Sequence, residues 1–94
     1  MYNIALDAVI RKALIAQMED VMKEVSFREK LTYMTHVDAE EWEDVKRKLE
    51  VIYGLESSIK DYLQIEYYKV ATRKLYMLNI LVEELKNALK KWGN

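Results

Sequence analysis

The only histidine of the chain, His36, is the first residue whose side chain could bind a metal or transfer a proton near neutral pH. It lies in a stretch predicted to be a turn between two helices, and Glu40 follows four residues later. A zinc site would need further ligands that the neighbouring spacing does not supply. We therefore interpret His36 as a surface residue, and predict no metal and no cofactor.

The carboxylates and hydroxyls also lack the spacing of a catalytic site. A run of acids follows the histidine at Glu40, Glu41, Glu43 and Asp44. On a helix these carboxylates spread around the outer surface, whereas a dinuclear metal site needs carboxylates that point inward. Ser57 and Ser58 are explained by helix capping, and no glycine-rich phosphate loop is present. The residue types thus favour a protein that is not an enzyme.

A lysine and several tyrosines are better interpreted as contact residues. Lys74 projects among apolar positions, so its ammonium either reaches water along an apolar stem or lies in a buried ion pair. Seven tyrosines stand against one phenylalanine, and rings with a polar end suit the margins of a core or an interface. The predicted interface comprises Lys74, Tyr62, Tyr76, Met77 and Leu81.

The length and composition of the chain limit the fold class and the number of domains that can hold these residues in place. The 94 residues suffice for one hydrophobic core, so we predict a single domain, residues 1–94. Proline and cysteine are absent and only two glycines occur, which favours an all-α fold without disulfides. The net charge of −1 disfavours nucleic acid as a partner. Without a secretion signal or a membrane-length apolar run, we expect a cytoplasmic protein with no membrane contact.

Apolar periodicity predicts a first helix over about 4–25, with Asn3 as its N-cap. At Ser26 the apolar stripe changes face, which indicates either a break or one long helix whose two halves face different partners. A second helix is predicted from the capping residue Asp38 to about Tyr53, where Gly54 would end it. Its stripe is Trp42, Val45, Leu49 and Ile52.

A third helix is predicted over about 56–92. Its heptad-like seam is Ala71, Leu75, Leu78, Val82, Leu85, Leu89 and Trp92. A second line lies beside it: Ile59, Leu63, Val70, Met77, Leu81 and Ala88. The expected architecture is a small bundle of three helices, long, short and long. Because the short helix cannot cover the last one, we expect self-association, with a homodimer as the simplest form. A continuous first helix that covers the last one within a monomer is the competing arrangement.

This layout resembles that of the all-helical chorismate mutases. Residues 4–7, Ile-Ala-Leu-Asp, and the arginines Arg11 and Arg28 look like the start of that family's pattern. The resemblance implies an alternative function, a small helical enzyme whose cationic groups bind a dicarboxylate between helices.

The sequence departs from the family's pattern at the remaining site positions. The family's second helix brings an Asp, then an Arg followed by a Glu, whereas here Asp38 is followed by Glu41 and Trp42. The family's late Gln or Glu has no match among residues 78–80, Leu-Asn-Ile. The sequence therefore favours a non-enzymatic interaction or assembly module, such as a regulatory, inhibitor or accessory subunit. This module would act through the apolar face of its C-terminal helix, on a second copy or on another protein.

Overall fold

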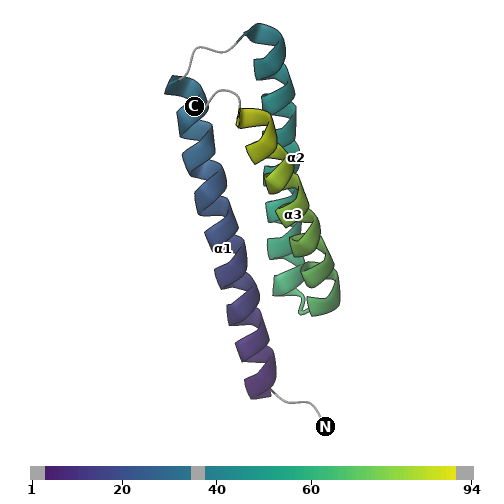
Figure 1. Cartoon of the computed structure of the whole chain (residues 1–94). Helices are drawn as coiled ribbons and strands as arrows, with labels where there is room; N and C mark the ends of the chain where they lie inside the picture. Colours follow the sequence, from purple (N-terminus) through teal and green to yellow (C-terminus); the bar gives the residue numbers. More distant parts are fainter. Residues whose placement is uncertain (1–3, 35–37, 91–94) are drawn as a thin grey trace.

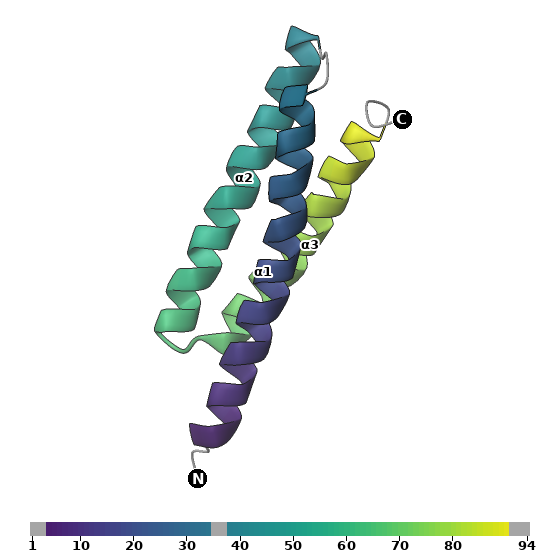
Figure 2. The same cartoon turned by 90° about the vertical axis from the view of Figure 1, so that its left-hand side faces the viewer.

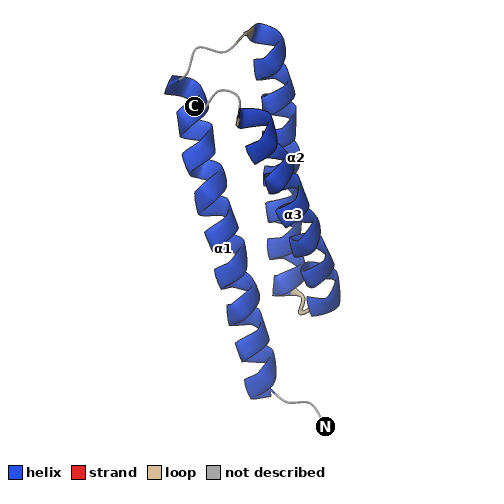
Figure 3. Ribbon diagram, viewed as in Figure 1, coloured by secondary structure: helices blue, strands red, loops and turns tan. Residues whose placement is uncertain are grey.

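The computed structural model describes residues 4–34 and 38–90, and within them the chain forms three helices and no strand (Figure 3). The helices are α1 (Ile4–Met34), α2 (Ala39–Gln64) and α3 (Tyr68–Leu89). α2 runs antiparallel to α1 and α3, which run parallel to each other (Figure 1). The predicted all-α bundle is confirmed. The predicted cap Asn3, His36 and Trp92 lie outside the described residues.

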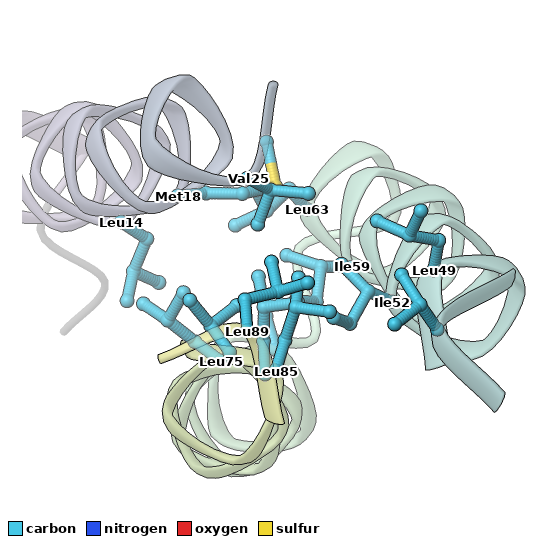
Figure 4. Packing of buried hydrophobic residues seen from close by; sticks show 14 residues of the cluster. Leu14, Met18, Val25, Leu49, Ile52, Ile59, Leu63, Leu75, Leu85 and Leu89 are labelled. Atoms are coloured by element: carbon cyan, nitrogen blue, oxygen red, sulfur yellow. The ribbon is translucent and has the colours of Figure 1, made fainter. Parts of the chain in front are cut away.

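The core lies between the three helices, and α3 packs against both α1 and α2. The predicted seam of α3 is buried at each of its described positions: Ala71, Leu75, Leu78, Val82, Leu85 and Leu89. The buried residues of α2 are Val45, Leu49, Ile52, Ile59 and Leu63, and the buried apolar residues of α1 are Leu14, Met18 and Val25. Figure 4 shows these side chains pointing toward one another from the three helices. Hydrophobic burial within one chain therefore holds the bundle together.

The first helix is continuous through Ser26, which is exposed and does not act as a cap. Of the two arrangements that the sequence left open, the long helix is the one formed. Of the apolar residues after the change of face, Phe27 and Met34 are 58% and 82% exposed, whereas Leu31 is half-buried. The N-terminal end of α1 extends beyond the turn that joins α2 to α3 (Figures 1 and 2).

Asp38 caps α2 as predicted. Its side-chain oxygen accepts hydrogen bonds from the backbone N–H groups of Glu40 at 2.9 Å and Glu41 at 3.4 Å. These two N–H groups have no partner within the helix, so the carboxylate satisfies them and its charge also complements the helix dipole.

The predicted end of the second helix at Gly54 is wrong. α2 continues for ten residues beyond this glycine, which lies exposed in the helix interior without a positive φ. The apolar stripe passes across it from Ile52 to Ile59, seven residues or about two turns later, and both residues are fully buried. Tertiary burial on both sides thus overrides the low helix propensity of one glycine.

The actual turn between α2 and α3 contains neither glycine nor proline. It consists of residues 65–67, in which Glu66 adopts a left-handed conformation with φ of 64°. The N–H of Tyr67 donates to the carbonyl oxygen of Tyr62 at 2.9 Å, and the Glu66 carboxylate pairs with Arg11 of α1 at 3.3 Å. The turn is therefore closed by its own backbone and also contacted by α1.

These boundaries correct the predicted order of long, short and long helices. The three helices have 31, 26 and 22 residues, so α2 is longer than α3 and can cover it along its length. The expectation that a short second helix leaves the seam of α3 uncovered is wrong, since the chain buries that seam itself. Any contact surface on α3 must instead lie outside the buried stripe.

Candidate interaction surface

Two of the predicted contact residues, Lys74 and Tyr62, meet each other within the chain. The Lys74 ammonium lies 5.4 Å from the centroid of the Tyr62 ring, and that ring stacks on Tyr67 at 6.3 Å. A cation over an aromatic face at a partly exposed site contributes about 0.5–1 kcal/mol. Lys74 therefore helps to join α3 to α2 through a ring contact, an arrangement that the sequence reasoning did not consider.

Tyr62 and Leu81 are half-buried and pack against the hydrophobic core. Tyr62 lies between α2 and α3, where Lys74 contacts its ring, and both Tyr62 and Leu81 contribute to the internal packing of the bundle. A partner could reach only their exposed edges. The predicted interface thus divides, with Tyr62, Lys74 and Leu81 in the internal contact and the other two residues on the outside.

The remaining predicted residues, Tyr76 and Met77, are 70% and 52% exposed. Ile80 is 45% exposed and lies one turn beyond Tyr76. At 100° per residue, Ile80 lies roughly 160° around the helix from both Leu78 and Val82, which belong to the core stripe. Tyr76 and Ile80 lie on the side of α3 opposite the core, and Met77 lies about 60° from Ile80 on the adjoining flank. These three exposed apolar residues are here called the outer patch.

Ile80 is an exposed apolar residue of α3 that the sequence analysis did not include in its predicted interface. It stands within the apolar run of residues 75–82, and the run alternates between buried and exposed positions in the structure. The available signal was its position one turn after Tyr76, off both predicted lines of α3. Helical spacing could therefore have grouped it with Tyr76 and Met77.

Charged residues border the outer patch at both ends. Lys69 and Arg73 precede it, and Glu83 and Glu84 follow it, and all four residues are exposed. Among residues 4–34 and 38–90, Arg73 and Glu84 have no ion-pair partner. The outer face of α3 is thus basic toward its N-terminal end, apolar in the middle and acidic toward its C-terminal end.

The flank of α3 that faces α1 is joined to α1 by an ion-pair group, which also includes Glu83 from the border of the outer patch. The Lys86 ammonium lies 2.8 Å from a carboxylate oxygen of Glu24 and 3.1 Å from one of Glu83. The hydrogen bond to Glu24 is the main cause that raises the pKa of Lys86 above its ordinary value. Lys86 therefore fixes α1 against α3 near the C-terminal end of the bundle.

Arg11 and Arg28, on which the resemblance to the chorismate mutases rests, do not form a common binding site within one chain. Arg11 and Arg28 are seventeen residues apart on a single continuous helix, which separates them by about 25 Å along its axis. Arg11 pairs with Glu66, and the Asp38 carboxylate is engaged as a helix cap. These groups cannot jointly surround one small dicarboxylate inside a single bundle.

No cluster of three metal-binding side chains occurs in the part of the chain that the structure describes. A hollow of about 530 Å³ lies where the start of α2 meets the end of α3. Its lining residues are Asp38, Glu40, Glu41, Asp44, Val45, Asn87 and Ala88. Asp38 caps α2, Glu40 and Glu41 lie in its first turn, where acids complement the helix dipole, and Asp44 pairs with Lys48 at 2.9 Å.

Comparisons with known proteins found no matching family model, no similar curated protein and no similar solved structure. None of the described helices is long and apolar enough to cross a membrane. The geometry of the surface is therefore the basis for a functional proposal.

Proposed function

We propose that this chain is a protein–protein interaction or assembly module that self-associates through the outer face of α3. The observation that supports the proposal is the outer patch, in which three large apolar side chains lie close together on the exposed side of α3. Tyrosine and methionine are enriched in protein interfaces, and burial of exposed apolar surface is favourable by about 25 cal/mol per Å². A homodimer is the simplest form, because a two-fold axis lets the same patch meet itself.

The test compares the solution mass of the wild-type chain with that of Ile80→Glu, measured by sedimentation equilibrium over a wide concentration range. We expect the wild type to approach twice the 11.2 kDa of the single chain, and Ile80→Glu to stay at 11.2 kDa. Because Ile80 is exposed, the variant should keep the helical circular dichroism spectrum of the wild type.

The matched control is Val9→Glu, which places the same charge on an exposed apolar position of α1 that is 63% exposed. It should dimerise like the wild type. A dimer that Val9→Glu separates and Ile80→Glu leaves intact would move the interface to α1. A wild type that remains at 11.2 kDa throughout would remove self-association.

A further inference from the structure

The charges that border the outer patch are arranged so that the surface is complementary to itself. Arg73 and Glu84 are eleven residues apart on α3, which is close to three full turns. They therefore lie on nearly the same line of the helix, within roughly 20° of each other and about 16 Å apart along the axis. Tyr76, Met77 and Ile80 occupy the space between them.

Two copies of this face can pair with their α3 helices either parallel or antiparallel. A parallel pair would place Arg73 against Arg73 and Glu84 against Glu84, and like charges in contact are unfavourable. An antiparallel pair about an axis midway between residues 73 and 84 places each arginine opposite the partner's glutamate. The macrodipoles of two antiparallel helices are also favourably oriented.

The same axis brings the apolar residues together. It passes between positions 78 and 79, so Met77 of one copy lies level with the partner's Ile80, and both residues are exposed. One register thus satisfies both the charges and the apolar contacts. We infer that two copies of this chain pair antiparallel through the outer faces of α3, with Arg73 of each copy paired to the partner's Glu84. This inference rests on the proposed function, since it specifies the partner and the geometry of that self-association.

Charge reversal tests the ion pairs directly. Arg73→Glu places a glutamate opposite the partner's Glu84 at two symmetric points, and Glu84→Arg does the same with arginines. We expect each single variant to raise the dimer dissociation constant at least about tenfold at low ionic strength. The double variant Arg73→Glu/Glu84→Arg restores opposite charges at both points, and should return to within about threefold of the wild type.

The matched control for charge is Lys46→Glu, which makes the same change of net charge at an exposed position on α2. It should leave the dissociation constant within about twofold of the wild type, because the changed charge is remote from the contact. All these variants replace exposed side chains, so unchanged helicity should accompany the changes in association.

Cross-linking tests the orientation independently. The chain has no cysteine, so single substitutions give unique attachment points for a short bismaleimide reagent. In the antiparallel pair, two copies of Met77→Cys lie close to the axis and should cross-link. Two copies of Asn87→Cys are about 25 Å apart along the helices and should not. A parallel pair would cross-link efficiently at both positions.

The outcomes separate this inference from the proposed function. A chain that stays monomeric would contradict both the proposed self-association and the antiparallel pairing. A dimer that Ile80→Glu separates, but that tolerates either charge reversal or cross-links through Asn87→Cys, keeps the proposed function and overturns the antiparallel pairing. Rescue by the double variant together with cross-linking at residue 77 alone supports the pairing.

Discussion

Tyr53 of α2 donates a hydrogen bond to the Glu29 carboxylate of α1, across the gap between the two helices. Tyr33 donates to the other oxygen of the same carboxylate at 3.5 Å, and its ring lies 5.4 Å from that of Trp42. Desolvation by its surroundings and the nearby Glu29 carboxylate raise the pKa of Tyr53 to about 12. Glu29 is thus a polar link between the C-terminal part of α1 and the middle of α2.

The raised pKa of Tyr53 predicts a specific loss of stability in alkaline solution. The folded chain holds this proton more tightly than the unfolded chain, whose tyrosine titrates near 10.0. The stabilising contribution is therefore complete below pH 10.0 and is lost as the pH rises to about 12. Tyr53→Phe should cost about 0.5 kcal/mol at neutral pH, since the bond is partly exposed to solvent.

Urea denaturation at a series of pH values checks this prediction. The difference in unfolding free energy between wild type and Tyr53→Phe should shrink through the alkaline range. Tyr76→Phe, which alters an exposed tyrosine on α3, is the control and should follow the wild type. A difference that stays constant with pH would show that the Tyr53 proton is not held by the fold.

The buried stripes predict large losses on truncation. Leu49 and Leu78 are 5% and 0% exposed, and Leu→Ala at either position leaves a cavity in the core. Each variant should lose about 2–5 kcal/mol of unfolding free energy. Glu43→Ala, at an exposed position of α2, should change it by less than about 0.5 kcal/mol. Similar melting temperatures for Leu49→Ala and Glu43→Ala would mean that the facing of α2 is wrong.

The helical position of Gly54 predicts that alanine stabilises the chain. A Cβ atom built there meets nothing within 4 Å, so the added methyl group fits without rearrangement. Gly54→Ala should raise the unfolding free energy by about 0.5–1 kcal/mol, because alanine loses less backbone entropy in a helix. If the helix instead ended at Gly54 with a positive φ, the same substitution would destabilise the chain. The sign of the change in unfolding free energy therefore distinguishes a glycine within the helix from one at its end.

The cap of α2 predicts a moderate effect at Asp38. Asp38→Ala removes the acceptor for two backbone N–H groups and should cost about 1 kcal/mol. Asp38→Asn keeps an oxygen in the same place and should cost less than the alanine variant. Thermal melts of the two variants measure the difference, and equal losses would indicate that the charge rather than the hydrogen bonds matters.

The sequence was sufficient to predict the helical class and most of the core. The stripe from Val45 to Ile52 and the seam from Ala71 to Leu89 are both buried, since apolar residues at three- and four-residue steps must share one face. The cap at Asp38 was also predictable, because its chemistry is local. Such features depend on residues close together in the chain.

The boundary between the last two helices was not predictable from turn residues. Gly54 looks like a helix end but is helical, while the true turn at residues 65–67 has only Ile, Glu and Tyr. A weaker signal was present in the core stripe, whose step from Leu63 to Ala71 is eight residues. At 100° per residue this step turns the stripe by about 80°, whereas a step of seven residues turns it by only about 20°.

The candidate surface was only partly predictable for a related reason. Tyr76 and Met77 were expected to be in contact with a partner and are exposed, but Lys74 and Tyr62 were assigned without knowledge that they meet each other. The contact between Lys74 and Tyr62 depends on where α2 ends and the chain turns into α3. An error in one helix boundary therefore changes which polar residues are available to a partner.

The three helices contribute unequally to the core, and this affects how the molecule unfolds locally. α1 is the longest helix, yet among the side chains that the structure describes it contributes only three of the fourteen in the buried apolar cluster (Figure 4). α2 and α3 supply the other eleven, and a turn of only three residues joins them, so their contacts need little loop closure. In native-state hydrogen exchange, α1 should therefore behave as a separate cooperative unit that detaches at lower free energy. Amides near Ile52 and Leu78 should exchange only when the whole chain unfolds.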